Sequence, residues 1–250
     1  MIRLKTAEEI TVMAEGGARL REVMRSLVPN IHSGMTTKQI DREAERLIRK
    51  QGGEPSFKKV RNYYWTTCLP VNEQVVHTPP SSRSLLPGDI LTIDIGMYYR
   101  GFHTDYADTI VVDGRSDAKK DRFLKTGHDA LYKSIEKARV GNHIGDISTV
   151  IEKEVYGHGY FILKELTGHG IGRELHEDPY VFGYNYRPKE KTPVIRPGLV
   201  IAIEIIYSMG TEEIAYEDDS DWSIVTADGS LAACFEHTVA ITDEKTEILT

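Results

Sequence analysis

The 250-residue sequence predicts an α+β fold with a mainly antiparallel sheet. Helical and strand patterns come in blocks, and several strands follow one another across turns too short for a helical crossover. A faint duplication is also present: residues 87–94 resemble 197–204 at an offset of 110, and residues 34–41 resemble 141–148 at an offset of 107. Because both pairs occur in the same order, we expect two related halves.

The first half is expected to open with two helices. Thr6 caps a helix that runs to about Leu27, with Glu9 placed to complete a capping box. A second helix covers residues 37–51. Apolar alternation then predicts strands over residues 64–77, 90–98 and 102–112.

The second half is expected to repeat this plan. Helical patterns cover residues 119–138 and 144–156. Strand patterns cover residues 160–166, 199–207, 222–226 and 231–241. No linker rich in Pro, Gly or Ser divides the chain, so we expect one catalytic domain over residues 1–250, with halves of approximately 1–118 and 119–250.

Composition excludes several function classes. The chain carries 31 Lys and Arg against 38 Asp and Glu, a net charge of −7. This acidic balance disfavours a protein whose main function is to bind nucleic acid phosphates. No apolar run approaches the roughly 18 residues of a membrane helix, and residues 1–10 lack the apolar segment of a secretory signal. Two cysteines cannot form a disulfide framework, so we expect a cytoplasmic protein. No amphipathic extension suggests an assembly partner, and we expect a monomer.

Two acids lie on the strands that flank residues 99–101. A turn centred between Tyr99 and Arg100 places Asp94 opposite Asp105. Opposed carboxylates repel each other, and their burial is worse unless one stays protonated or a cation binds. Two exposed acids on a solvated sheet face are the alternative, and the spacing alone leaves both interpretations open.

Further metal-binding residue types occur in the second half. Glu204 occupies the duplicate position of Asp94 at the end of a very apolar strand, and Glu236 lies in another apolar strand. Glycines flank His169 in the run from Gly168 to Gly172, which lets the backbone approach closely around one imidazole. Four carboxylates and one histidine suit divalent Mn, Fe, Co or Zn, and carry enough charge for two ions.

These residues, in this order, resemble the methionine aminopeptidases, a family with the pita-bread fold and its pseudo-twofold. The resemblance runs through nearly the whole chain. It is carried by Ile2-Arg3-Leu4-Lys5-Thr6, Asn72-Glu73-Gln74-Val75-Val76-His77, Ile93-Asp94, Gly101-Phe102-His103-Thr104-Asp105, Gly168-His169-Gly170-Ile171-Gly172, His176-Glu177-Asp178-Pro179, Ile203-Glu204 and Phe235-Glu236-His237-Thr238.

The resemblance implies a set of metal ligands and two active-site histidines. The implied ligands are Asp94, Asp105, His169, Glu204 and Glu236. His77 and His176 match the active-site imidazoles, whereas His103 and His237 are expected to support neighbouring ligands. Only 35 residues separate His169 from Glu204, and 32 separate Glu204 from Glu236, which leaves no room for the helical insertion of the family's second type. The chain therefore looks like the short first type found in bacteria.

The implied reaction removes the N-terminal methionine from nascent proteins and peptides. Two divalent ions (Co, Mn, Fe, Ni or Zn) would be bridged by a hydroxide that attacks the scissile carbonyl. We expect Glu204 to shuttle the proton, His176 to donate to the carbonyl or its oxyanion, and His77 to position the substrate. A substrate of nascent chains also makes the ribosome a candidate partner.

A small apolar pocket is expected to select methionine. Tyr63, Cys68 and Trp222 align with residues that line this pocket in relatives, and Phe57 and Leu175 fall at neighbouring wall positions. The alternative for Tyr63 and Trp222 is ordinary core packing. A small second residue in the substrate is expected to be preferred.

Some residues depart from the family pattern. Ile205 stands where relatives commonly have Pro, Thr78 follows His77 where Gly is usual, and Leu175 replaces an aromatic residue. A proline-specific relative shares the metal set, but its last ligand usually lies in an Arg-Ile-Glu context, unlike Glu236. A non-catalytic binding protein of the same fold is the other alternative, and such proteins lose ligands that this chain keeps.

Overall fold

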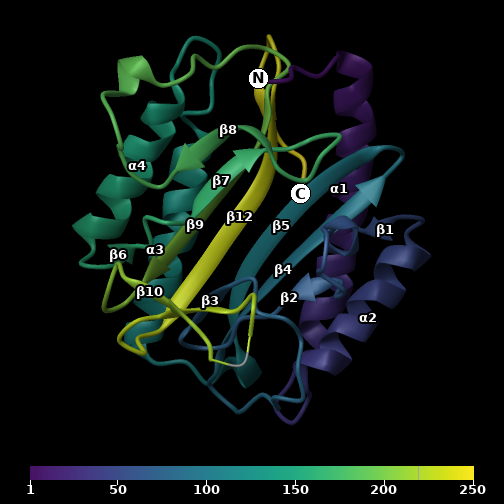
Figure 1. The fold of residues 1–250 in the computed structure, drawn as a ribbon, viewed down its shortest axis with the longest axis vertical. Helices are drawn as coiled ribbons and strands as arrows, with labels where there is room; N and C mark the ends of the chain where they lie inside the picture. Colours follow the sequence, from purple (N-terminus) through teal and green to yellow (C-terminus); the bar gives the residue numbers. More distant parts are fainter. Residues whose placement is uncertain (219) are drawn as a thin grey trace.

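In the computed structural model, which describes residues 1–218 and 220–250, four α-helices lie behind one large sheet (Figure 1). Side chains that alternate along the strands divide between the two faces of the sheet. Ile93 and Ile95 pack with helices α1 (Ala7–Leu27) and α2 (Thr37–Lys50). Ile203 and Ile205 pack with α3 (Ala118–Ile135) and α4 (Ile144–Gly157). The opposite face carries Glu204 and Glu236 together with apolar residues such as Ile206.

The expected helices are confirmed, with shifts of a few residues at their ends. Thr6 caps α1, and the reciprocal bonds between Thr6 and Glu9 form the expected capping box. Short 3-10 helices supplement them: η1 (Val28–Asn30), η2 (Phe57–Lys59), η3 (Val112–Gly114) and η4 (Lys189–Lys191). None of the helices in the described residues is long and apolar enough to cross a membrane.

The described strand pairs are all antiparallel, as expected. The ten-stranded sheet follows the order β1 (Glu54–Pro55), β4 (Ile90–Tyr99), β5 (Phe102–Val111), β12 (Ala232–Ile241), β9 (Val200–Ser208), β7 (Thr167–Gly170) and β8 (Glu177–Phe182). Attached to it are β2 (Thr67–Cys68) on β4, β6 (Phe161–Ile162) on β9 and β13 (Thr246–Ile248) on β12. A three-stranded sheet joins β10 (Ile214–Tyr216), β11 (Ile224–Thr226) and β3 (Gln74–Val76).

The single strand expected over residues 64–77 is wrong. Only β2 and β3 form there, because Pro70 has no N–H to donate and Asn72 has a positive φ of 59°. The strand expected over residues 160–166 is reduced to β6, and the short strands β1, β7, β8, β10 and β13 were not predicted.

The hairpin of β4 and β5 has a different register from the one expected. Tyr99 pairs with Phe102, so the turn consists of Arg100 and Gly101, whose φ angles are 48° and 94°. Two positive φ angles are typical of a type I′ turn, which matches the twist of the flanking strands. Asp94 therefore pairs with Ala107 and Asp105 with Gly96, so the predicted direct opposition of the two acids is wrong. A shift of two residues keeps both acids on one face.

Corresponding elements recur at the offsets seen in the sequence. Helices α2 and α4 both have 14 residues and begin 107 residues apart, each at a capping box. Strands β4 and β9 begin 110 residues apart, after Gly88 and Gly198 with φ angles of 87° and 88°. The assignment of one catalytic domain with halves divided near residue 118 stays a prediction.

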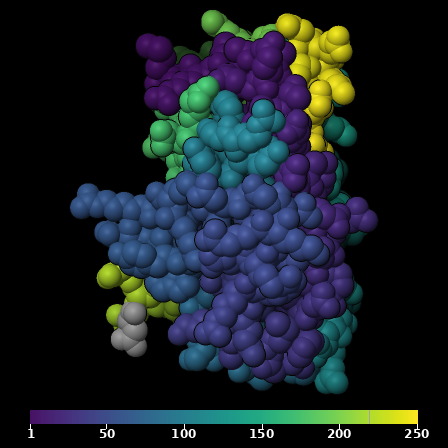
Figure 2. Space-filling view, turned by 90° about the vertical axis from the view of Figure 1, so that its right-hand side faces the viewer, coloured from purple at the N-terminus to yellow at the C-terminus, as the bar shows by residue number. Residues whose placement is uncertain are grey.

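The chain ends meet at one end of the molecule. In Figure 2 the N-terminal residues (purple) lie beside the C-terminal residues (yellow). The Arg21 guanidinium donates to the carbonyl oxygen of Leu249 at 2.8 Å, and Lys5 N donates to the carbonyl oxygen of Gly198 at 2.7 Å. The segment before α1 is therefore tied to the turn that starts β9.

Candidate metal centre

Three of the five predicted ligands form one row across the middle of the large sheet. Asp94 on β4 pairs with Ala107 on β5, Ala107 pairs with Glu236 on β12, and Glu236 pairs with Glu204 on β9. Directly paired residues point to the same face. The small Ala107 separates Asp94 from Glu236, so the three carboxylates share a space that no bulky side chain of β5 fills at this level.

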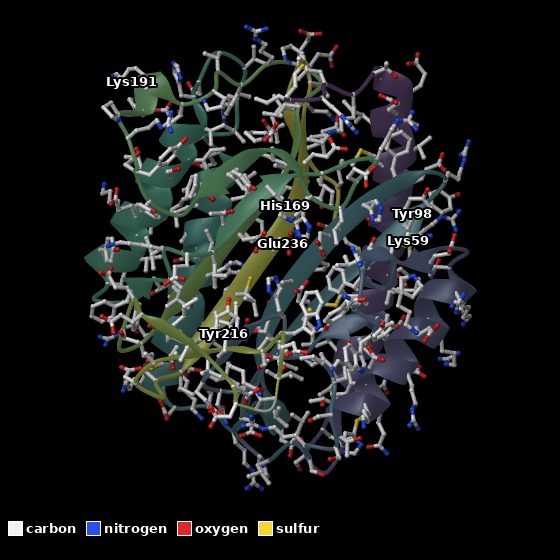
Figure 3. The ribbon with its side chains drawn as sticks, in the orientation of Figure 1. Lys59, Tyr98, His169, Lys191, Tyr216 and Glu236 are labelled. Carbon is white, nitrogen blue, oxygen red and sulfur yellow. The ribbon has the colours of Figure 1, made fainter. Side chains whose placement is uncertain are left out.

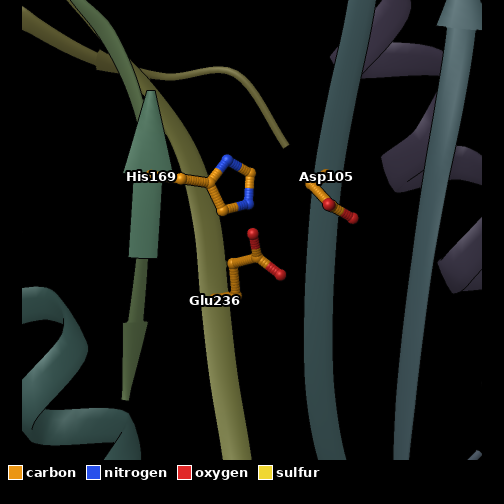
Figure 4. A group of neighbouring side chains, drawn as sticks. All are labelled: Asp105, His169 and Glu236. Atoms are coloured by element: carbon orange, nitrogen blue, oxygen red, sulfur yellow. The ribbon is translucent and has the colours of Figure 1, made fainter. Parts of the chain in front are cut away.

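The other two ligands belong to the next row. Thr238 joins the strands here: Asp105 N donates to Thr238 Oγ1 at 2.8 Å, and that hydroxyl donates to the carbonyl oxygen of Asp105 at 2.8 Å. Thr238 pairs with Ala202 on β9, which pairs with His169 on β7. Figure 3 shows His169 and Glu236 beside each other at the middle of the sheet, and Figure 4 shows that Asp105, His169 and Glu236 come from three strands, with the His169 ring and the Glu236 carboxyl in the space between them. Their potential ligand atoms all lie within 4.8 Å of one another.

The glycines beside His169 let its strand approach its neighbours, as the sequence predicted. A Cβ at Gly168 would lie 2.5 Å from the carbonyl oxygen of Ala202, and one at Gly170 would lie 2.1 Å from that of Asp178. His169 Nδ1 lies 2.9 Å from the carbonyl oxygen of Gly170, to which it can only donate. That bond leaves Nε2 with a lone pair, 3.5 Å from Glu204 Oε1.

The electrostatics of the cluster are unfavourable without a cation. Burial and mutual repulsion raise the pKa of Asp94, Glu204 and Glu236 well above their usual range, and burial raises that of Asp105 to about 7. Burial lowers the pKa of His169 to about 3, so its ring is neutral. Glu236 Oε1 is buried with no hydrogen-bond partner. The alternative of Asp94 and Asp105 as two exposed acids on a solvated face is wrong, since Asp105 is 4% exposed and Asp94 is half-buried in the cavity wall.

This arrangement fits bound divalent cations. No Lys or Arg is among the described residues that line the cavity, so no side chain there offsets the acids. The orphaned oxygen of Glu236 and the facing lone pairs of His169 and Glu204 are both satisfied by a metal ion. Oxygen ligands with one imidazole are suited to a divalent ion of the first transition row or zinc.

A cavity of about 290 Å³ contains the cluster, and every predicted site residue lines it. His77 and His176 are exposed, as access by a substrate requires. The ring centroid of His176 is 4.4 Å from that of His169. His77 has a positive φ of 56°, a strained conformation for a residue with a Cβ. Although both residues reach solvent, the cavity walls remove much of the water around their rings; this desolvation lowers the pKa of His77 to about 4 and also lowers that of His176.

An aromatic and sulfur-containing wall lies beside the cluster. The Tyr63 hydroxyl donates to the carbonyl oxygen of Thr67 at 2.8 Å and lies 3.1 Å from Cys68 Sγ. The Tyr63 ring meets Trp222 edge to face at 5.2 Å and Phe57 at 6.3 Å. Leu175 completes the part of this wall that was predicted.

Sequence reasoning missed other wall residues. These are Val60, Val76, Glu165, Leu166, Thr167 and Ile206. Glu165–Thr167 directly precede the glycine run around His169, and this proximity was the available signal. Reasoning also missed Asp41, whose Oδ1 accepts bonds from Thr66 N at 2.9 Å and Thr67 N at 3.0 Å. Asp41 thereby anchors the segment that carries Cys68.

The remaining histidines and the departures from the family pattern lie outside the cluster or at its wall. His103 Nδ1 is 2.9 Å from Ser56 Oγ, and His237 Nε2 is 3.2 Å from the Tyr132 hydroxyl; neither histidine lines the cavity. Ile205 is buried in the core on the helix side of the sheet. The Thr78 hydroxyl bonds to Ser223 Oγ at 2.9 Å, which fixes the segment after His77.

Comparison with known proteins places this geometry in a family. The model of metallopeptidase family M24 matches residues 11–243. Methionine aminopeptidase 1 of Bacillus subtilis is 40% identical over 250 residues, covering 100% of this chain and 99% of its own length. The crystal structure of a methionine aminopeptidase from Thermotoga maritima superposes with a TM-score of 0.95 at 35% identity, covering 100% of this chain and 99% of that one.

A more distant structure shares the fold alone. Prolidase from Pyrococcus furiosus has a TM-score of 0.80 at 22% identity, and the match covers 99% of this chain but 65% of that one. This likeness confirms the predicted pita-bread fold. The chain therefore belongs to metallopeptidase family M24, and within it to the short, bacterial-sized methionine aminopeptidases, which are metal-dependent aminopeptidases.

Proposed function

We propose that this protein removes the N-terminal methionine from nascent proteins and peptides with the help of two divalent metal ions. The observation that carries the proposal is the convergence of four carboxylates and His169 in one cavity whose wall is aromatic and sulfur-containing. Such a cavity combines a hydrolytic centre with a site for an apolar, flexible side chain.

The five predicted residues would hold the ions. Asp94, Asp105 and Glu236 offer carboxylate oxygens, Glu204 offers another, and His169 offers Nε2. The metals, drawn from Co, Mn, Fe, Ni and Zn, would activate a water, polarise the scissile carbonyl and hold the substrate's amine. Four carboxylates balance the charge of two such ions better than that of one.

Three side chains would then act on the substrate. Glu204, which lines the cavity with Oε1 3.5 Å from His169 Nε2, takes a proton from the attacking water and delivers it to the leaving amine. His176, beside His169 and exposed to the cavity mouth, donates to the scissile carbonyl as negative charge develops on its oxygen. His77 positions the substrate amide from its strained backbone conformation.

Specificity would come from the wall formed by Tyr63, Cys68 and Trp222. Their aromatic and sulfur groups suit a thioether, and the two edge-to-face rings resist rearrangement. A small second residue in the substrate is preferred because it must pass the wall that faces the metal centre. We expect the enzyme to work as a monomer in the cytoplasm on chains that leave the ribosome.

The deciding experiment compares peptides across a metal titration. Chelator-treated protein should cleave Met-Ala-Ser only after a divalent metal is restored, and Leu-Ala-Ser and Ala-Pro peptides should react far more slowly. Preference for the Ala-Pro peptide would favour a proline-specific enzyme, and no cleavage of any peptide would favour a binding protein. Glu204→Gln tests the proton shuttle: turnover unchanged at full metal loading would exclude Glu204 from that role.

A further inference from the structure

Two residues of the motifs that carry the family resemblance, Lys5 and Glu177, have no part in the chemistry proposed above, and their side chains meet in the structure. Lys5, near the N-terminus, forms an ion pair with Glu177, 172 residues later: Lys5 Nζ lies 2.8 Å from Glu177 Oε2. Both side chains are 4% exposed. A pair at this depth differs from most pairs in the described residues, where at least one partner is well exposed.

Each member of the pair also holds a backbone group. Lys5 Nζ donates to the carbonyl oxygen of Arg3 at 3.1 Å, and Lys5 N donates to that of Gly198. Glu177 Oε1 accepts a bond from Glu174 N at 3.1 Å. The carboxylate of Glu177 therefore connects the N-terminal segment to the loop of residues 171–176, which joins β7 to β8.

That loop carries two residues of the site. Leu175 belongs to the cavity wall and His176 lies at the cavity mouth. No hydrogen bond to a protein group fixes the His176 side chain in the described residues, and its ring contacts His169 edge to face. The position of the His176 ring therefore depends on the backbone that carries it.

The loop is also packed closely against the ion pair. A Cβ at Gly172 would lie 2.4 Å from Lys5 Cε and 3.0 Å from Glu177 Oε1. His103 N donates to the carbonyl oxygen of Gly172 at 2.7 Å. The loop thus contacts the ion pair at Gly172 and at Glu174, before the two site residues, and Glu177 of the pair follows them directly.

We propose that the buried Lys5–Glu177 pair is a positioning device that holds the loop of residues 171–176 so that His176 meets the scissile carbonyl. This inference rests on the proposed function, and it assigns neither Lys5 nor Glu177 a contact with substrate. If the His176 side chain is displaced from the scissile carbonyl, the rate of the chemical step falls more than substrate affinity does. The reason is that its hydrogen bond to the carbonyl oxygen forms mainly in the transition state. Loss of the pair should therefore lower kcat and leave KM nearly unchanged.

The test uses the double variant Lys5→Met/Glu177→Gln in the full-length protein. Removing one partner alone strands a buried charge and risks unfolding, whereas the double variant removes both charges and keeps similar volumes. Arg173→Met is the matched control. Arg173 lies in the same loop and pairs with Glu9 at 2.7 Å, but its side chain is 60% exposed.

Two measurements are made on each variant. With metal restored, the double variant should cleave Met-Ala-Ser with a kcat lower by about tenfold or more and a KM within about threefold of wild type. In the metal-free protein, amide hydrogen exchange over residues 172–177 should be faster by about tenfold, while exchange over residues 232–241 in β12 is unchanged. Arg173→Met should alter neither measurement by more than about twofold.

Each other result overturns the proposal. A wild-type kcat in the double variant, a rise in KM alone, unchanged exchange in the loop, or equally faster exchange in β12 would each contradict it. The exchange measurement needs neither metal nor turnover. If wild-type protein fails to cleave any Met peptide, the proposed function fails, and the exchange result still decides whether the pair holds the loop.

Discussion

Glu204 and Glu236 lie directly opposite each other in the antiparallel ladder of β9 and β12. Two carboxylates in this relationship repel, and burial raises the pKa of both. The ladder is set by backbone bonds and by the core on the other face of the sheet, so the protein imposes this proximity on the acids. The two acids therefore lower the stability of the metal-free protein, and they create a site that attracts cations.

Replacement of one of these acids should separate its effect on folding from its effect on metal binding. At pH 8 without metal, Glu236→Gln is expected to raise the free energy of unfolding by about 1–3 kcal/mol, because it removes a buried, repelled charge. The same variant should gain less stability than wild type when Mn²⁺ is added. Urea unfolding with chelator and with Mn²⁺ measures both, and a destabilised metal-free variant would contradict the expectation.

Metal affinity should rise with pH between about 5.5 and 7. The metal-free site holds a proton on Asp105 below its pKa of about 7, and metal binding must displace that proton. Affinity should then increase by roughly tenfold per pH unit for each proton displaced. The rise continues above pH 7 as long as Asp94, Glu204 and Glu236, whose pKa values are also raised, still hold protons. His169, with a pKa of about 3, contributes nothing to this change between pH 5 and 8.

Calorimetric titration of Mn²⁺ tests this pH dependence. The heat in buffers of different ionisation enthalpy counts the protons released, which should be more numerous at pH 6 than at pH 8. An affinity that does not change between pH 5.5 and 7 would show that the carboxylates are already ionised in the metal-free site.

The wall at Trp222 should govern substrate binding more than turnover. Trp222→Ala removes a ring that lines the cavity and supports Tyr63, and we expect KM for Met-Ala-Ser to rise by about 10–100-fold, with a smaller change in kcat. Trp65→Ala is the matched control, since Trp65 also meets Tyr63 at 5.2 Å but does not line the cavity. Equal effects of the two variants would assign both rings to core packing.

The hairpin of β4 and β5 shows what sequence could and could not predict about the site. The expected turn placed Asp94 and Asp105 opposite each other and therefore on one face of the sheet, and the shared face is confirmed although the opposition is not. The register was wrong by two residues, because it depends on which residues adopt positive φ in the turn. Arg100 adopts a positive φ before Gly101 does. Glycine in a sequence indicates that such a conformation is possible, whereas arginine does not.

The site residues that lie far apart in the sequence were predicted from a different kind of evidence. Residue types and order identified His169 and Glu236 through a family resemblance, and the structure brings both into one cluster. The pair of Lys5 and Glu177 was not predicted, although both lie in motifs that carry the family resemblance, since no local pattern relates residues 172 positions apart. The short strands β7 and β8 were missed because glycine and proline weaken the strand signal.

The close approach around His169 gives the last prediction. Gly170→Ala would place a Cβ 2.1 Å from the carbonyl oxygen of Asp178, a backbone atom that cannot move without shifting β8. We expect a loss of about 1–3 kcal/mol in the free energy of unfolding and weaker metal binding, since His169 lies on the displaced strand. Gly157→Ala is the control, because Gly157 ends α4 with open space around it and Ala favours a helix. Thermal unfolding with and without Mn²⁺ measures both effects, and a Gly170→Ala variant with wild-type stability and metal affinity would mean that β7 and β8 can separate without disturbing the site.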